Sequence, residues 1–247
     1  MEERLDKLLI QRGLVSTRVR AERMIRETGV LVNGKLINKT GKRFPVDSVI
    51  EVLEEEVPWV SRGALKLIAA IEKWQPELQD KTLIDLGAST GGFTEVLLSH
   101  DVAKVFCVDV GKDQLHPRIR ENKKVVNLEK THVRELNTNL IKEPVDGVVI
   151  DVSFISLTKV LPFLHPLVKP EGFIIALVKP QFEVGKENVG KGGIVKDKSL
   201  YPKVIQSIKE NASLNNFQYI DHIESPILGG DGNMEFLMLM KRVTPVT

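Results

Sequence analysis

The sequence predicts an α/β protein: a doubly wound, mostly parallel sheet with an antiparallel last strand, preceded by a small α+β domain. From residue 80 onward, short apolar runs alternate with helical segments, the pattern of strands covered on both faces by crossover helices. One run, "TLIDL", leads into a glycine-rich turn, "GASTGG" (87–92), and then into apolar residues at helical spacing. Ligands of such sheets bind outside the carboxyl ends of the strands.

The charge distribution predicts a boundary between two domains. Residues 1–43 hold eleven basic and five acidic side chains, a net charge of +6. Residues 44–60 hold five acids and no base, and include the polar stretch "EEEVPW". A change of sign at such a stretch is typical of a linker. We therefore expect a small domain over residues 1–58 and a larger domain over residues 59–247.

The composition narrows the class of protein. With 42% hydrophobic and 28% charged residues the chain is typical of globular proteins, and no apolar run is long enough to span a membrane. The N-terminus has no apolar core of a signal peptide. Cys107, the only cysteine, stands in an apolar run that favours a buried inert thiol, and the five histidines show no metal-ligand spacing. We expect a cytoplasmic protein that binds no metal.

The first 43 residues predict two helices and a hairpin. Leucines at positions i, i+3 and i+4 indicate a first helix, which Gly13 would end in the left-handed conformation. Ser16 or Thr17 can cap a second helix, which Gly29 would end. The stretch "VLVNGKLI" then predicts a hairpin, because its Asn-Gly pair supplies the positive φ angles of a type I′ turn.

The second helix places arginines on its outer side. Guanidinium groups bind phosphate oxygens bidentately, so this surface suits an RNA backbone. A solvated helix face explains the charges equally well, and charge alone leaves both interpretations open. The predicted RNA-binding residues are Arg4, Arg12, Arg18, Arg20, Arg23, Arg26 and Lys35.

This N-terminal segment resembles a known family. "RLDKLLIQRGLVSTRVRAERMIRETGVLVNGK" is similar to the RNA-binding domain first described in a small-subunit ribosomal protein, the S-four type. The arginines of the second helix and the "VNG" turn carry the resemblance. It implies that the N-terminal domain binds structured RNA.

The glycine-rich turn does not fit the common phosphate-binding loops. A dinucleotide fingerprint needs glycine where Ser89 stands, and a P-loop needs lysine where Phe93 follows Gly92. Asp85 could balance the amino group of S-adenosylmethionine, and Asp109, at the end of the next strand, could accept hydrogen bonds from ribose hydroxyls. Either acid alone is explained as a helix cap; together they favour a methyl donor. The predicted cofactor-binding residues are Asp85, Gly87, Ala88, Ser89, Thr90, Gly91, Gly92, Phe93, Asp109, Val110, Glu129 and Asp151.

Longer motifs resemble the hemolysin-A-like (TlyA) branch of the FtsJ ribose methyltransferase superfamily. They are "WVSRGALKL", "DLGASTGGFTEVLL", "VDVGKDQL", "DVSFISL", "LVKPQFEVGKENVGKGGIVKD" and "GNMEFLML". The resemblance covers essentially the whole chain. It implies a Rossmann-like domain that uses S-adenosylmethionine to methylate a ribose 2′-hydroxyl of ribosomal RNA, usually at cytidine. The implied partners are ribosomal RNA and ribosomal subunits.

The resemblance also implies a catalytic set of Lys66, Asp151, Lys179 and Glu235. Asp151 and Lys179 end two strands at the ligand edge, and Glu235 reaches that edge if the last strand is antiparallel. Lys179 would be the general base, although the sequence leaves open whether its surroundings remove its proton. Taken singly, Lys66 is better explained as a charge on a helix surface, and Lys179 could simply end a strand in solvent. Joined by family motifs at all four positions, the set favours the catalytic interpretation.

The sequence argues against two other functions. A membrane-damaging toxin would need an inserting segment or an export signal, and neither is found. An RNA-binding assembly factor with a vestigial donor site would not need the lysines and acids.

Two local stretches also carry predictions. The stretch "GKENVGKGG" (185–193) is either a surface loop or a lid over the substrate. The stretch "SLTKVLPFLHPLV" (156–168) predicts a helix.

Overall fold

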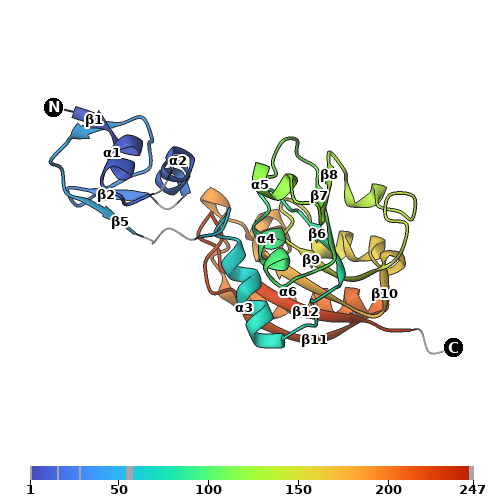
Figure 1. The fold of residues 1–247 in the computed structure, drawn as a ribbon. Helices are drawn as coiled ribbons and strands as arrows, with labels where there is room; N and C mark the ends of the chain where they lie inside the picture. Colours follow the sequence, from blue (N-terminus) through green and yellow to red (C-terminus); the bar gives the residue numbers. More distant parts are fainter. Residues whose placement is uncertain (1, 16, 28, 54–57, 245–247) are drawn as a thin grey trace. The chain divides into compact units, whose positions relative to one another are not determined.

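The computed structural model describes residues 2–15, 17–27, 29–53 and 58–244, with only the backbone of Val19, Arg23 and Glu27. The chain forms two compact units, Met1–Pro58 and Trp59–Thr247 (Figure 1). Each unit has its own apolar core. Among the described residues, no helix is long and apolar enough to cross a membrane.

The first unit packs two helices against short antiparallel strands. Its elements are β1 (Glu2–Arg4), α1 (Leu5–Gln11), α2 (Arg18–Glu27), β2 (Val30–Val32), β3 (Lys35–Ile37), β4 (Arg43–Pro45) and β5 (Ile50–Val52). β1 pairs with β4, and the other three strands form a sheet of order β3-β2-β5. Leu5, Leu9, Ala21 and Ile25 from the two helices are fully buried in the core.

The helix ends and the hairpin predicted for this unit are confirmed. Gly13 and Gly29 have φ angles of +67° and +78°, the left-handed conformation that ends a helix. Thr17 Oγ1 accepts a hydrogen bond from the backbone N–H of Arg20, as a helix cap does, while Ser16 lies outside the described residues. The turn between β2 and β3 has positive φ angles at Asn33 and Gly34.

The second unit is built on a seven-stranded sheet. Its strands are β6 (Thr82–Leu86), β7 (Lys104–Asp109), β8 (Val125–Glu129), β9 (Val145–Ile150), β10 (Val168–Val178), β11 (Phe217–Glu224) and β12 (Phe236–Arg242). Their order is β11-β12-β10-β9-β6-β7-β8. The strands from β6 to β10 are parallel to one another, and β12 is antiparallel to both β10 and β11. The predicted doubly wound sheet with an antiparallel last strand is therefore confirmed.

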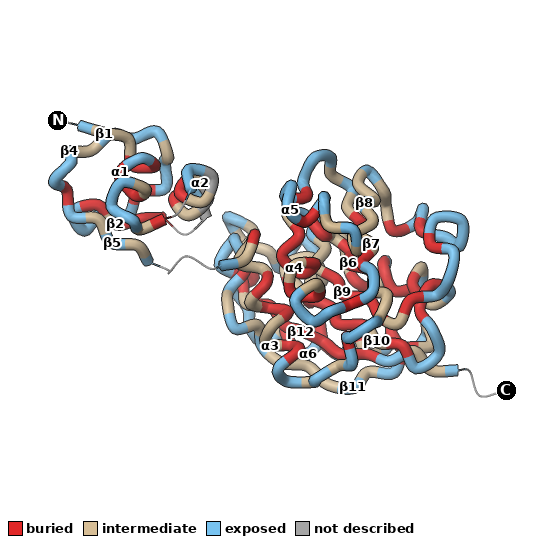
Figure 2. Tube along the Cα trace, in the orientation of Figure 1, coloured by how far each residue is buried: buried red, intermediate tan, exposed pale blue. Residues whose placement is uncertain are grey.

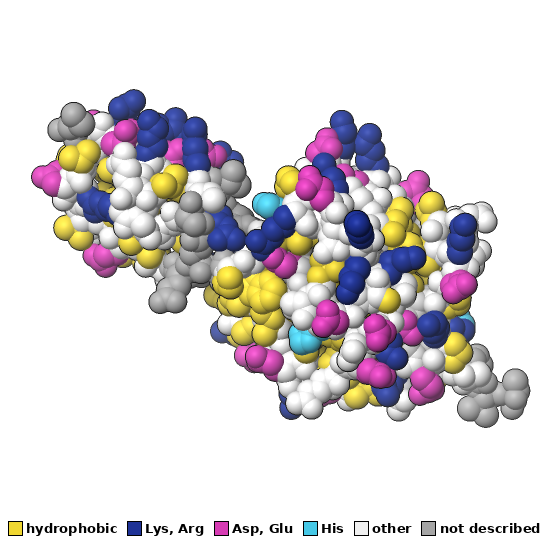
Figure 3. All heavy atoms as spheres, viewed as in Figure 1, with side chains coloured by type: hydrophobic (Ala, Val, Ile, Leu, Met, Phe, Trp, Pro, Cys, Tyr) yellow, Lys and Arg dark blue, Asp and Glu magenta, His cyan; other side chains and the backbone are white. Residues whose placement is uncertain are grey.

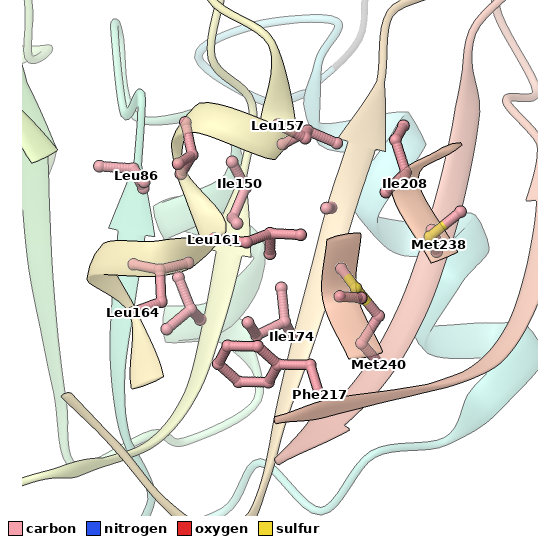
Figure 4. Packing of buried hydrophobic residues seen from close by; sticks show 14 of the residues in the cluster. Leu86, Ile150, Leu157, Leu161, Leu164, Ile174, Ile208, Phe217, Met238 and Met240 are labelled. Carbon is pink, nitrogen blue, oxygen red and sulfur yellow. The ribbon is translucent and has the colours of Figure 1, made fainter. Parts of the chain in front are cut away.

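Apolar side chains cover both faces of this sheet. The α-helices of the second unit are α3 (Ala64–Trp74), α4 (Gly92–Ser99), α5 (Pro117–Arg120) and α6 (Tyr201–Leu214). Leu83 belongs to the cluster that contains residues of α3 and α4, whereas Ile84 belongs to the cluster that contains residues of α6, because successive strand residues point to opposite faces. Figure 2 shows the buried strands beneath the more exposed surface, and Figure 4 shows the second of these clusters.

The helix predicted over residues 156–168 is wrong. The segment forms three 3₁₀ turns instead: Leu157–Lys159, Leu161–Phe163 and His165–Leu167. Pro162 and Pro166 each lack an N–H and place a ring against the preceding turn, which interrupts an α-helix. The leucine spacing still serves packing, because Leu161, Leu164 and Leu167 are buried against the sheet.

Candidate active site

The glycine-rich turn brings the chain close to two neighbouring strands. Gly87 has a φ of +86°, and a Cβ on it would clash with the backbone carbonyl of Asp151, so only glycine fits. The backbone N–H groups of Gly87 and Ala88 both donate to the carbonyl of Val108, at 2.8 and 3.1 Å. These contacts hold the turn against the carboxyl ends of β7 and β9.

A cavity of about 570 Å³ opens at this edge of the sheet. Its volume lies in the range of sites that hold a small-molecule cofactor. Polar groups stand at one side, and apolar side chains supply the rest of the wall. Among the lining residues are Gly87, Ser89, Asp109, Val110, Val133, Asp151, Val152, Ser153 and Phe154.

The carboxylate of Asp109 is held in one orientation at the cavity. Its Oδ2 accepts from the backbone N–H of Ser89 at 2.8 Å, and its Oδ1 accepts from the backbone N–H of Gly111 at 2.7 Å. Each carboxylate oxygen has a further lone pair, so both can still accept a hydrogen bond from a ligand. The carboxylate that the sequence assigned to ribose is thus presented to the cavity by the turn itself.

Asp85 lies beneath the turn rather than among the residues that line the cavity. It is fully buried, and its Oδ2 accepts from Thr94 Oγ1 at 2.6 Å. Its Oδ1 has no hydrogen-bond partner within the described part of the chain. Burial, followed by the smaller effects of the charges of Asp151 and Asp109, raises the pKa of Asp85 to about 7 against the opposing hydrogen bonds of Thr94. Thr94 Oγ1 also lies 3.0 Å from the buried Cys107 thiol, which the sequence predicted to be inert.

Five further predicted cofactor residues belong to the turn or directly follow it. Ala88, Gly91, Gly92 and Phe93 are buried, and Thr90 accepts a backbone hydrogen bond from His116. These five do not line the cavity that the described residues form.

Glu129 shapes the loop that follows β7. Its carboxylate accepts from the backbone N–H groups of Asp113, Gln114 and Leu115, and these donors lower its pKa to about 2. Gln114 lines the cavity, whereas Glu129 itself does not. The acid therefore acts on the shape of the cavity wall through the backbone of this loop.

The four residues of the predicted catalytic set come together as two ion pairs. Nζ of Lys66 lies 2.6 Å from Oε2 of Glu235, and Nζ of Lys179 lies 2.7 Å from Oδ1 of Asp151. Burial raises the pKa of Glu235, whereas the charges of Lys66 and Lys179 oppose the rise. Lys179 and Asp151 both act on the charge of Glu235, so the two pairs are neighbours.

The sheet topology explains why these residues meet. Asp151 directly follows β9, and Lys179 directly follows β10. Glu235 directly precedes β12, whose Phe236 pairs with Val178, and the antiparallel direction brings its carboxylate to the same edge. Lys66 comes from the first turn of α3 and is buried, which excludes a helix-surface charge. Lys179 is also not an exposed strand end, because its side chain is 11% exposed.

Two further side chains at this edge were missed by sequence reasoning. Ser153 Oγ accepts a hydrogen bond from Nζ of Lys179 at 2.8 Å. Phe154 is 90% exposed at the cavity, has a φ of +65°, and lies 5.2 Å from the Phe182 ring. An exposed aromatic ring on strained backbone is unusual, but a sequence pattern gives no sign of the strain or of the exposure.

The first unit carries the predicted RNA-binding residues, and the partners of Arg4, Arg12 and Arg18 within the chain order these side chains. Arg4 pairs with Asp6 at 2.9 Å, and Arg18 contacts both Asp6 and Glu22. Arg12 donates to the carbonyl of Val46 at 2.6 Å. These contacts order the three guanidinium groups at the surface.

The other predicted RNA-binding residues differ in exposure. Arg26 and Lys35 are exposed, Arg20 is half-buried, and the side chain of Arg23 lies outside the described residues. Arg26 also lines a hollow together with Lys39 and Lys42. Figure 3 shows lysine and arginine side chains gathered along one side of this unit.

Residues 59–242 match the FtsJ-like methyltransferase family, and residues 3–50 match the S4 domain. The chain is 38% identical to the 16S/23S rRNA (cytidine-2′-O)-methyltransferase TlyA of Mycobacterium tuberculosis (strain ATCC 25618 / H37Rv), over 98% of this chain and 90% of that protein. It is 34% identical to hemolysin A of Brachyspira hyodysenteriae, over 95% of this chain and 98% of that protein.

Solved structures agree with these matches. A protein of Streptococcus thermophilus that is named as a hemolysin superposes with a TM-score of 0.77 at 36% identity, over 98% of this chain and 89% of that chain. An S-adenosylmethionine-dependent methyltransferase of Mesorhizobium loti shares only 12% identity at a TM-score of 0.53, over 70% of this chain and 96% of that chain, which shows the fold alone. The chain belongs to the FtsJ-like methyltransferase family, with an S4 domain in front of the methyltransferase domain.

Proposed function

We propose that this protein transfers a methyl group from S-adenosylmethionine to a ribose 2′-hydroxyl of ribosomal RNA, with cytidine as the target. The observation that carries the proposal is the tetrad: two buried or half-buried ion pairs, Lys66–Glu235 and Lys179–Asp151, at the sheet edge where the cavity opens. Full-length relatives that carry the name rRNA (cytidine-2′-O)-methyltransferase support the same reaction. We assign RNA binding to residues 1–58 and methyl transfer to residues 59–247.

The cavity fits the cofactor in its chemistry. Asp109 presents lone pairs for ribose hydroxyls, Gly87 lines the cavity, and Val110 and Val133 offer apolar walls for a nucleobase. Asp85 lies one layer below, with Oδ1 unpaired among the described groups, so it favours positive charge above the turn. When bound, S-adenosylmethionine supplies a methyl group on a positively charged sulfur.

Lys179 is the proposed general base. Its Nζ is held between Asp151 Oδ1 at 2.7 Å and Ser153 Oγ at 2.8 Å. Only the neutral amine accepts a proton, so Lys179 first gives its own proton to solvent. Its neutral Nζ then takes the 2′-hydroxyl proton as the ribose oxygen bonds to the methyl carbon and the bond from that carbon to sulfur breaks. Asp151 Oδ1 lies 2.7 Å from the amine that receives the proton and holds it in place.

Lys66 and Glu235 position the reaction. Glu235 forms an ion pair with Lys66 in a site with little access to water. The charge of Lys179 also acts on Glu235. A fixed pair of this kind orients the ribose without reorganising during the reaction, and such positioning supplies a large part of a catalysed rate.

The first unit holds the RNA. The proposed contacts are made by the basic residues of α2 and by Lys35, whose positive charges bind phosphates independently of base sequence. Arg4, Arg12 and Arg18 stay within this set, with their guanidinium groups ordered by their partners in the chain.

The test is methyl transfer followed by mapping of the product. Purified protein is incubated with tritiated S-adenosylmethionine and with isolated small subunits, large subunits or naked rRNA. The nucleosides are then separated after complete digestion. The proposal expects label in a 2′-O-methylated cytidine, and loss of that label with Lys179→Met. Label on a base contradicts it, and bound S-adenosylmethionine with no transfer to any RNA supports an assembly factor. Lysis of cells that survives Lys179→Met supports a toxin.

A further inference from the structure

Asn233 is a buried polar residue that the tetrad does not include. It is 2% exposed, and its side-chain amide spans two points of another segment. Its Oδ1 accepts from the backbone N–H of Val195 at 3.0 Å, and its Nδ2 donates to the backbone carbonyl of Gly193 at 2.8 Å. A buried amide that is satisfied in this way fixes the position of the backbone it holds.

The backbone of Asn233 belongs to the turn that leads into β12. Gly229 donates its N–H to the carbonyl of Asn233 at 2.8 Å, which closes the turn. The same glycine lies against the catalytic carboxylate, because a Cβ on Gly229 would be 2.5 Å from Oε1 of Glu235. Ser225 also donates its N–H to the carbonyl of Glu235 at 2.9 Å. One turn, residues 225–235, therefore carries both Asn233 and Glu235.

The segment that Asn233 holds, residues 185–197, follows Lys179 closely in the chain. It folds back on itself through a bridge between Val189 and Val195, and Gly190 donates its N–H to Ile194 at 2.8 Å. Val195 is its one buried residue, while Lys186, Lys191 and Lys196 are exposed. The buried Val195 and the two hydrogen bonds of Asn233 thus attach a lysine-bearing segment to the body of the domain.

We infer that Asn233 is a positioning residue, which fixes segment 185–197 on the turn that carries Glu235. The lysines of this segment are then held at a set distance from the tetrad, where they bind the RNA phosphates that flank the target ribose. This inference rests on the proposed function. Loss of the two Asn233 hydrogen bonds lets the segment open locally, which weakens its binding of RNA.

The first experiment compares Asn233→Ala with the wild-type protein under single-turnover conditions on ribosomal subunits. We expect the rate constant to fall about tenfold or more, because both anchoring bonds are lost and the segment moves. Affinity for S-adenosylmethionine, measured by calorimetry, stays unchanged. Trypsin cleaves faster after Lys191 and Lys196. The matched control is Asn215→Ala, because Asn215 also donates to a backbone carbonyl but does so at the end of α6.

Asn233→Asp separates the two anchoring bonds. The aspartate keeps an acceptor for Val195 but replaces the donor with an oxygen that faces the carbonyl of Gly193. We expect an intermediate loss of rate and intermediate protection from trypsin. A variant that loses cofactor affinity and thermal stability without faster cleavage in the segment shows a merely structural role and overturns the inference.

A double-mutant cycle with Val195→Pro supplies a second measurement. Proline removes the N–H that Asn233 accepts, and the extended backbone of Ile194, with ψ of 129°, suits a residue before proline. If Asn233 acts through this segment, Val195→Pro slows the wild type but slows Asn233→Ala little further. Fully additive losses overturn the inference.

The outcomes also separate the inference from the proposed function. If the wild-type protein transfers no methyl group to ribose, the proposed function fails, while the trypsin pattern still reports on the anchor. If the wild type is active and Asn233→Ala matches it in rate and in cleavage, only the inference fails. If Asn233→Ala does not fold, Val195→Pro alone decides, by the same rate and cleavage measurements.

Discussion

Lys66 and Glu235, 169 residues apart in the sequence, form a buried ion pair with 2.6 Å between Nζ and Oε2. Their side chains are 9% and 3% exposed, so water screens the attraction little. Desolvation offsets much of the attraction in such a pair, whereas loss of one partner leaves the other charge buried alone. The pair is therefore costly to break and adds little to stability, which is typical of charges retained for the chemistry of a site.

Lys66→Met is expected to lower the free energy of unfolding by about 3 kcal/mol, because the carboxylate of Glu235 loses its partner. Lys66→Met combined with Glu235→Leu should recover most of that loss and remain inactive. Urea unfolding measures the stability, and methyl transfer measures the activity. Equal, additive losses of stability in the double variant would show that the two side chains do not interact.

Lys179→Met should slow methyl transfer by a factor on the order of 10² or more, because methionine keeps the length of the side chain but accepts no proton. Binding of RNA and of the methyl donor should survive. Lys179→Arg should fail as well, since guanidinium stays protonated. Single-turnover rates check both variants, and near-normal turnover by Lys179→Arg would show that this residue acts only as a fixed positive charge.

Asp109→Ala is expected to weaken binding of S-adenosylmethionine and to disturb the fold little. The carboxylate also accepts from the N–H groups of Ser89 and Gly111, so Asp109→Asn serves as the matched variant that keeps one acceptor for this backbone. We expect the asparagine variant to bind better than the alanine variant and less well than the wild type. Unchanged affinity of both variants in a calorimetric titration would remove Asp109 from the site.

Asp85 should make the protein less stable as the pH rises. Burial raises the pKa of this carboxyl to about 7 from its ordinary value of 3.8, so the folded state holds a proton that the unfolded state has lost between those values. Stability therefore falls from about pH 4 to about pH 7, by up to about 1.4 kcal/mol per pH unit, and levels off above.

Asp85→Asn removes this titration and tests the effect. We measure the free energy of unfolding of both proteins by urea unfolding and take the difference, variant minus wild type. We expect this difference to increase from pH 5 to pH 8. Because other titrating groups are common to both proteins, they cancel in the difference. A difference that stays constant over this range would mean that Asp85 is ionised throughout.

Neutralising Arg20, Arg23 and Arg26 together should weaken RNA binding and flatten its dependence on salt, because fewer counterions are released. Affinity for the methyl donor should not change. Lys203→Gln, on α6, is the control for a loss of charge elsewhere. Filter binding at several salt concentrations measures the slope. If affinity and slope both persist, this arginine face is only a solvated surface.

The local patterns of the sequence determined the elements and their chemistry. Apolar runs alternating with helices predicted the sheet, and the Asn-Gly pair at residues 33 and 34 predicted the hairpin, because both depend on neighbours in the chain. The same reasoning erred at residues 156–168, where leucine spacing indicated a helix and two prolines prevented one. The leucines are nevertheless buried by packing. Their spacing therefore predicted burial correctly and the helix wrongly.

Only the tertiary structure decided how the site is assembled. Family motifs named Lys66 and Glu235, but their contact depends on an antiparallel β12 that returns residue 235 to the edge where β9 and β10 end. Ser153 and Asn233 stand within quoted family motifs, but their roles depend on a residue or segment that the sheet brings near. Asp85 shows the same limit: the sequence marked its charge, whereas its burial below the turn and its raised pKa follow from residues packed around it. A sequence specifies which groups are present, and long-range packing sets their distances and their exposure to water.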